Sequence, residues 1–305
     1  MLPLKTELHC HNIFSNGHVG ALEPIYDCNV TIPAQLEQAY LSGLDVLFVT
    51  NHNTIDGYRQ MLEYKKNHQK FDGLNVYPAE EVTTDNESHV LVYGINHSIK
   101  SGLSLQDVLD EAKKQDAVTI APHPFSLLDA LREDSIYCDL FEVFNSSNVD
   151  VYSNLRAQKF ANEKSLHVVA GSDSHVQSTI GRSTNLIYSE NKLDSVITAM
   201  KHHKIIVDNA QYIQPKDALE HIRYKIQNSA FFIDKYTSQF YPRALLPIKM
   251  LYKLYMINPE GVFWNMLYRI SLVGLRRISR KINFEGYDHR LFRERNLVNI
   301  LKMVF

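Results

Sequence analysis

The amino-acid sequence predicts an α/β fold, in which a βα barrel precedes a mainly helical C-terminal region. Over the first two hundred residues, short apolar runs alternate with stretches whose apolar residues have helical spacing. Such alternation is typical of repeated βα units around a mostly parallel sheet. Histidines and carboxylates also follow the ends of the apolar runs, where βα barrels place their active sites. A chain of 305 residues is long enough for such a domain and an appended region.

The apolar runs predict seven strands, at Leu4–Cys10, Asp45–Thr50, Leu74–Glu81, His89–Ile95, Ala117–Pro122, Leu140–Phe144 and His167–Ala170. Helical spacing predicts helices between and after them, at Pro33–Ser42, Ile55–His68, Leu105–Gln115, Val151–Lys164 and Leu193–His202. Pro33 suits the first turn of its helix, where the missing N–H has no partner to lose.

The pattern loosens beyond Ile205, and residues 209–216 resemble a connector that contains Pro215. We therefore divide the chain into a barrel at residues 1–208 and a basic, aromatic-rich helical region at 209–305. The helices predicted in this second region are Lys216–Asn228, Ala244–Met256, Val262–Lys281 and Arg290–Val304.

Charge is distributed unevenly between the two regions. Residues 231–305 hold 13 Lys and Arg against 5 Asp and Glu, so this part carries +8 and the first 230 residues carry −10. The same part holds 14 of the 32 aromatic residues, which argues against a disordered polybasic arm. We expect it to be folded.

Three widely spaced cysteines, Cys10, Cys28 and Cys138, indicate neither a disulfide framework nor a CxxC metal site. The segment Met1–Lys5 lacks the features of a signal peptide, and no stretch of 18 uncharged apolar residues occurs. A cytoplasmic protein is expected, with peripheral attachment to a membrane as a further option.

Two histidines end the first predicted strand. In the sequence His9-Cys10-His11, the twofold period of a strand points both imidazoles to the same side, where both can reach one metal ion. The other predicted strands have comparable residues at their ends, and we expect these to meet at one mouth of the barrel: His52, Glu80, Glu81, His89, His123, Asp173 and His175.

Imidazole nitrogens together with carboxylate oxygens suit Zn²⁺, Mn²⁺ or Fe²⁺, whereas Ca²⁺ and Mg²⁺ prefer mostly oxygen ligands. One histidine at a strand end is usually structural, and GSDSH alone could be a helix N-cap. The conjunction of several such segments predicts a site for two or three metal ions.

The motifs resemble those of the PHP family, which is named for polymerase and histidinol phosphatase domains. They occur in family order within residues 1–205: HCHNIFSNG (9–17), TNHNT (50–54), PAEEVTT (78–84), HVLVYGI (89–95), APHPF (121–125), FEVFNSS (141–147) and GSDSH (171–175). The resemblance implies a distorted seven-stranded βα barrel with a trinuclear metal site and metal-dependent phosphoesterase activity.

The resemblance also implies three groups of ligands. His9, His11, Glu81 and Asp173 would hold one ion. Glu81 would bridge to a second ion, held by His89 and His123. His52 and His175 would hold the third. Glu81 occupies the family's carboxylate position, and Glu80 would be its neighbour.

Two residues depart from the family pattern. Asn16 and Asn51 stand where many members have Asp, and Asn offers a carbonyl oxygen but no charge. We therefore expect weaker binding of the third ion. His18, two residues after Asn16, is a substitute ligand or simply an exposed residue.

The expected reaction is hydrolysis of phosphomonoesters, plausibly nucleotides or short oligonucleotides, by a water that the metals activate to hydroxide. His52 or His175 could protonate the leaving group. Arg182, just beyond GSDSH, could clamp a phosphate. Glu142 and Asn145, at the end of the sixth predicted strand, are candidates for contacts to ligands or substrate.

Two alternatives stay open at this point. The chain could be a binding or regulatory module with a degenerate metal site, although every other ligand is present. It could also be a metal-dependent amidohydrolase, although no lysine suited to bridging metals ends a predicted strand.

The C-terminal region has three interpretations. Its aromatic residues alternate with Arg276, Arg277, Arg280 and Lys281, a combination that can bind nucleic acid. Residues 245–282 could instead lie on an anionic membrane surface. The third interpretation is a helical subdomain that packs on the barrel or on a protein partner.

Overall fold

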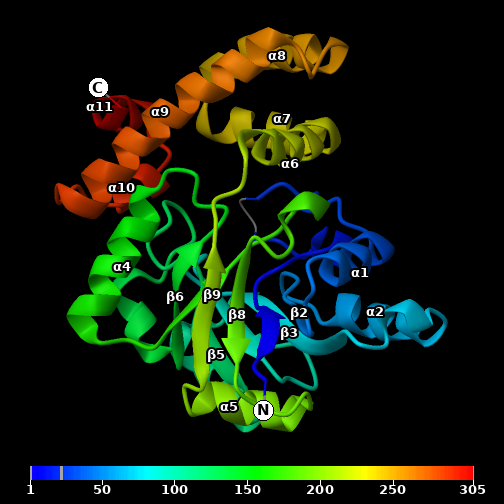
Figure 1. Cartoon of the computed structure of the whole chain (residues 1–305). Helices are drawn as coiled ribbons and strands as arrows, with labels where there is room; N and C mark the ends of the chain where they lie inside the picture. The colour runs from blue at the N-terminus through cyan, green and yellow to red at the C-terminus, as the bar shows by residue number, and fades with distance from the viewer. Residues whose placement is uncertain (1, 21–22, 305) are drawn as a thin grey trace.

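Nine strands form one sheet in the computed structural model, which describes residues 2–20 and 23–304 (Figure 1). Their order in the sheet is β7-β6-β5-β4-β3-β2-β1-β8-β9. The strands are β1 (Leu4–Glu7), β2 (Val46–Val49), β3 (Asn75–Thr83), β4 (His89–Tyr93), β5 (Val118–Ala121), β6 (Leu140–Asn145), β7 (Val168–Gly171), β8 (Ser183–Ile187) and β9 (Ile205–Ala210).

Strands β4 and β8 run opposite to the other seven. β4 is antiparallel to both β3 and β5, and β8 is antiparallel to both β1 and β9. The remaining ladders are parallel. The carboxyl ends of seven strands and the amino ends of β4 and β8 therefore lie at the same end of the sheet.

The two edges of the sheet meet, so that the sheet curves into a nearly closed barrel. Strand β7, at one edge, also lies against β8 and β9 at the other. The Asn185 side chain in β8 donates to the Ala170 carbonyl (2.7 Å) and accepts from the Ala170 amide (2.9 Å) in β7. The buried Asn185 side chain thus makes hydrogen bonds to β7 where no backbone ladder joins β7 and β8.

The predicted barrel is confirmed, but its sheet has two more strands than the seven predicted. The additional strands are β8 and β9, which follow the GSDSH segment. Helices of the barrel begin and end within two residues of the predicted positions: α1 (Ile32–Leu41), α2 (Asp56–Lys66), α3 (Leu105–Lys114), α4 (Tyr152–Lys164) and α5 (Leu193–Lys201). Side-chain oxygens of Thr31 and Ser104 cap α1 and α3 at their N-termini.

One hydrophobic core fills the barrel, and α5 closes one end of it. Phe48, Tyr93 and Val169 from the strands pack in this core together with Val196 and Met200 from α5. Figure 1 shows α5 at the end of the barrel opposite to the C-terminal helices. A ligand therefore reaches the barrel from the other end, where the parallel strands finish.

The C-terminal region is helical and stands over that open end (Figure 1). It consists of α6 (Pro215–Asn228), α7 (Ala230–Phe240), α8 (Leu245–Ile257), α9 (Val262–Phe284), α10 (Arg290–Arg293) and α11 (Leu297–Val304). The sequence did not predict α7, and it predicted a single helix where α10 and α11 are separate.

Helix α9 attaches this region to the barrel. The Ser279 hydroxyl donates to the Asp150 carboxylate (2.6 Å), and the Asn283 amide donates to the Phe125 carbonyl (3.3 Å). Ile278 and Ile282 pack against Leu127 of a barrel loop. These contacts hold the second half of α9, whereas its first half has many exposed apolar residues. Within residues 2–20 and 23–304, no helix has the length and apolarity needed to cross a membrane.

The link between Asn185 and Ala170 predicts a large loss of stability on substitution. In Asn185→Ala, the Ala170 amide and carbonyl lose their buried partners, so the free energy of unfolding should fall by about 2–4 kcal/mol. Urea denaturation measures this change. Asn96→Ala, at an exposed position, is the control and should change it by less than about 0.5 kcal/mol. Equal effects of the two substitutions would contradict this role of Asn185.

Candidate metal centre

The predicted ligands gather at the open end of the barrel. His9 and His11 follow β1, His52 follows β2, Glu81 lies in β3, and His123 follows β5. His89 looked exceptional in the sequence because it begins its strand. Since β4 is antiparallel to β3, and His89 pairs with Thr83, it lies at the same end as the others.

Glu81 is at the centre of this cluster, and its carboxylate is buried. Its Oε1 atom lies 2.9 Å from Nδ1 of His89 and 3.0 Å from Nε2 of His123. Its Oε2 atom lies 3.2 Å from Nε2 of His11 and 3.4 Å from Nε2 of His9. The two oxygens thus face two different pairs of imidazoles, as expected of a carboxylate that bridges two ions.

Glu80 faces away from the cluster, because successive residues of a strand point to opposite sides. Its Oε1 atom accepts a hydrogen bond from the Ile99 amide at 2.5 Å. Burial raises the pKa of the Glu80 carboxyl to about 7. The structure therefore places Glu81 in the cluster and Glu80 outside it. This agrees with the family motif, in which Glu81 occupies the carboxylate position.

Asp173 completes the first predicted group. Its Oδ1 atom lies 3.5 Å from Nε2 of His9 and 3.5 Å from Nε2 of His11. Asp173 and His123 both have positive φ angles, of 51° and 28°. Left-handed backbone is uncommon for such residues and is often found at functional sites, where the surrounding structure enforces it.

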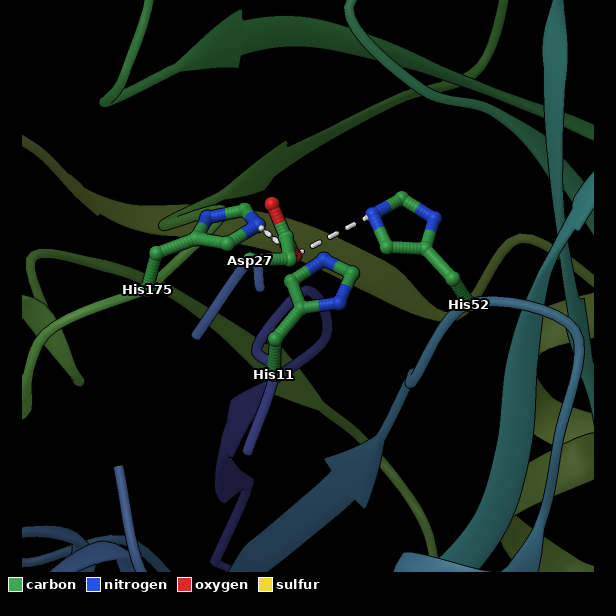
Figure 2. A group of neighbouring side chains, drawn as sticks. All are labelled: His11, Asp27, His52 and His175. Atoms are coloured by element: carbon green, nitrogen blue, oxygen red, sulfur yellow. Dashed lines mark ion pairs between the residues drawn. The ribbon is translucent and has the colours of Figure 1, made fainter. Parts of the chain in front are cut away.

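The third group contains a carboxylate that the sequence analysis missed. Asp27 lies among His11, His52 and His175, and Figure 2 shows these three rings around it. Its Oδ2 atom is 2.9 Å from Nε2 of His175 and 3.5 Å from Nε2 of His52. Asp27 supplies a negative charge at the group that was expected to lack one.

Asn16 and Asn51, the two departures from the family pattern, support the loops behind the site. The Asn16 side-chain oxygen accepts from the amides of Asp27 (2.7 Å) and Cys28 (3.0 Å), and so positions Asp27. The Asn51 oxygen accepts from the Asn12 amide at 2.8 Å. His18 is exposed and belongs to none of the metal-binding groups found among the described residues.

Unpaired atoms test whether this site fits metal ions. Buried side-chain atoms in this cluster have no hydrogen-bond partner among the described residues: His11 Nε2, Asp27 Oδ2, His52 Nδ1, both nitrogens of His89, and His123 Nδ1. Carboxylate oxygens lie 2.9–3.5 Å from four of the imidazole nitrogens, and Nε2 of His175 lies 2.9 Å from Asp27 Oδ2, but in directions unsuited to hydrogen bonds.

The spacing of the donor atoms also fits metal ions. Ligands about 2.0–2.2 Å from one ion, at octahedral or tetrahedral angles, lie roughly 2.8–3.6 Å from each other. The separations measured around Glu81 fall in this range. Unpaired buried atoms at this spacing are costly without an ion, so the residues fit a multinuclear metal site.

Glu142 and Asn145 hold the ligands rather than belong to a group themselves. The Glu142 carboxylate lies 2.9 Å from His9 Nδ1 and accepts from the His123 amide at 2.6 Å. Asn145 donates to Glu142 (2.9 Å) and to Asp173 (3.2 Å). Carboxylates that orient ligating histidines in this way strengthen metal binding.

Arg182 lies outside the cavity over the cluster, contrary to its predicted role in binding phosphate. Its guanidinium is 3.8 Å from the Asp217 carboxylate of α6. The cation that lines the cavity is Lys225, whose ammonium group is 2.8 Å from Asp27. The cavity has a volume of about 170 Å³.

His221 and Asp129 also line the cavity and were not predicted from the sequence. His221, on α6 with Lys225, stacks on His175 at a centroid distance of 4.6 Å. Asp129 lies 3.4 Å from His123 Nδ1. A four-residue spacing on a predicted helix places His221 and Lys225 on one face, but no spacing indicated that this helix covers the barrel.

Charge within the cluster shifts several pKa values. Burial alone would lower the pKa of His89, but the Glu81 carboxylate outweighs this effect and raises it to about 9. Asp129 and Glu81 likewise raise the pKa of His123 to about 10 against the effect of burial. Asp27 raises that of His175 to about 9. Without metal ions, these imidazoles hold protons at neutral pH.

Parts of the chain are similar in sequence to a known family and to a known protein. Residues 151–205 match the family described as PHP-associated. The uncharacterized protein MJ1587 of Methanocaldococcus jannaschii is 31% identical over 166 residues, which are 52% of this chain and 93% of that protein.

Two solved structures share the fold. PsfC from Pseudomonas syringae PB-5123 has a TM-score of 0.53 and 16% identity, over 74% of this chain and 99% of that one. The lesion-specific endonuclease PfuEndoQ from Pyrococcus furiosus has a TM-score of 0.50 and 17% identity, over 66% of this chain and 56% of that one. This chain thus spans little more than half of the endonuclease.

The family match covers α4, β7, β8 and α5, and it includes Asp173 and His175 of the cluster. The ligand motifs of the sequence converge on the same end of the same barrel. From the matched segment, the shared fold and the order of these motifs, we conclude that the chain belongs to the PHP family.

Proposed function

We propose that this protein is a metal-dependent phosphoesterase that hydrolyses phosphomonoesters. The observation that carries the proposal is the set of unpaired, buried imidazole and carboxylate atoms around Glu81 and Asp27. A cavity of about 170 Å³ opens over this set, and Lys225 lines it. A small polar cavity with a cation suits a phosphate group.

Three groups of residues would hold the ions. His9 and His11 face both Oε2 of Glu81 and Oδ1 of Asp173, and His89 and His123 face Oε1 of Glu81. His52 and His175, with Asp27, form the third group. Divalent ions in these groups would lower the pKa of a water molecule and neutralise charge on the phosphate oxygens. Mn²⁺, Zn²⁺ and Fe²⁺ suit this mixture of nitrogen and oxygen donors.

The residues of the chain have distinct tasks in this reaction. Water adds to phosphorus, the bond from phosphorus to the ester oxygen breaks, and the alcohol leaves with a proton. Lys225 offers its ammonium group to the phosphate oxygens, the task first assigned to Arg182. His175 or His52, when it is not bound to a metal ion, is the candidate for the proton donor, because both residues line the cavity.

Glu81→Gln should abolish most of the metal binding and activity, because the bridging charge is lost. We expect at least two fewer ions per chain by elemental analysis, and kcat/KM for p-nitrophenyl phosphate with Mn²⁺ lower by about 100-fold or more. Glu80→Gln is a matched control: it replaces the adjacent buried glutamate, which faces away. Equal loss of metal in the two variants would contradict the assignment.

Metal binding should release protons, because ligation requires neutral imidazoles. Because the pKa values of His9, His89, His123 and His175 are all raised, loading at pH 7 should displace about four protons. Affinity for metal should therefore increase as the pH rises from 7 towards 9. Calorimetric titration in buffers with different ionisation enthalpies counts the protons. Loading without proton release would contradict this arrangement of ligands.

A further inference from the structure

An apolar pocket adjoins the metal cavity. It has a volume of about 300 Å³ and lies between the start of α6 and the middle of α9. His221 lines both cavities and therefore lies between them. Ser147, which also lines the apolar pocket, donates a hydrogen bond to the Asp173 carbonyl at 2.9 Å. The pocket therefore begins beside a predicted metal ligand.

A second apolar cavity continues from the first. It has a volume of about 510 Å³ and lies among helices α6, α7, α8 and α9. Ile222, Tyr268 and Ser271 line both apolar cavities. Its other walls are mainly aliphatic and aromatic side chains, among them Ile226, Leu251 and Trp264. The three cavities thus form a series that starts polar at the metal ligands and becomes apolar with distance.

The first apolar pocket offers few groups that could bind a sugar or a base. Apart from His221, its polar side chains are Ser147, Ser271 and Tyr268, and the remainder are apolar. A sugar or a base bound there would leave several of its polar groups without hydrogen bonds, at a considerable cost. Burying a hydrocarbon chain there is favourable instead, by about 0.8 kcal/mol for each methylene.

We infer that the substrate is a phosphate monoester of a long apolar alcohol, whose phosphate lies at the metal centre while its chain extends along the two apolar cavities. This inference rests on the proposed function and names its substrate class. Together the apolar cavities are within the size range of sites that enclose small organic ligands. The ester oxygen would lie near His221, where the polar and apolar cavities meet.

Chain length provides the test. For phosphate monoesters of straight-chain alcohols from two to twelve carbons, assayed as monomers with the Mn²⁺-loaded protein, kcat/KM should rise about fourfold per methylene, the ratio equivalent to ~0.8 kcal/mol. The rise should level off once the cavities are filled. Alkylphosphonates of the same lengths, which are not hydrolysed, should show the same trend in binding affinity.

Ser271→Trp should block the junction between the two apolar cavities, because Ser271 lines both. In this variant, the gain in kcat/KM with chain length should stop several carbons earlier than in the unmodified protein. Val273→Trp is the matched control. Val273 is exposed on the same helix and lines neither of these cavities, so it should behave as the unmodified protein.

The outcomes separate this inference from the proposed function. Hydrolysis that does not depend on chain length, or a preference for nucleoside monophosphates over hexyl phosphate, would overturn the inference and leave phosphoesterase activity intact. Phosphonate binding that tightens with chain length, without hydrolysis of any ester, would support the apolar site and overturn the proposed activity. Phosphonate binding that does not depend on chain length would overturn the inference. The two apolar cavities would then serve another occupant, such as a protein helix.

Discussion

The buried carboxylate of Glu81 lies between two pairs of imidazoles, and most of the site is arranged around it. Burial alone would raise its pKa, but His89 and His9 outweigh this effect and hold the pKa well below its usual range. A charge in such a place needs compensation from several directions. The barrel provides it, because β1, β2, β4 and β5 bring imidazoles to the end of the sheet where Glu81 lies. The reversed direction of β4 is part of this arrangement, since it brings His89 to Glu81.

Much of the fold could be predicted from the sequence, since buried strands and amphipathic helices leave a clear periodic pattern. Strands β8 and β9 were missed for a physical reason. β8 reads Ser183-Thr184-Asn185-Leu186-Ile187, and its buried polar residues make hydrogen bonds that a hydrophobicity pattern does not show. β9 has only one buried residue, Ile205. Helix α7 follows α6 after a single residue, Ser229, and its aromatic residues hide its period.

The site could be predicted only as far as strand ends define it. The predicted ligands that follow or begin strands do lie next to one another, because a barrel brings those strand ends together. Asp27 was not predicted because it lies in a loop. Its position is set by the side-chain oxygen of Asn16, which accepts from the Asp27 backbone amide, and not by a strand. Lys225 and His221 come from α6, outside the barrel, and their approach depends on packing between regions. Arg182 follows a strand-end motif closely in sequence, yet its guanidinium faces Asp217.

We propose that Glu81 bridges two ions and that Asp27 completes a third site. A crystal structure of the Mn²⁺-loaded protein, with anomalous differences recorded at the manganese edge, tests it most directly. We expect two peaks on opposite sides of the Glu81 carboxylate, one near His9 and His11 and the other near His89 and His123, and a third peak beside Asp27. If a protein saturated with Mn²⁺ showed no peaks around Glu81, a bridging role for this carboxylate would be ruled out.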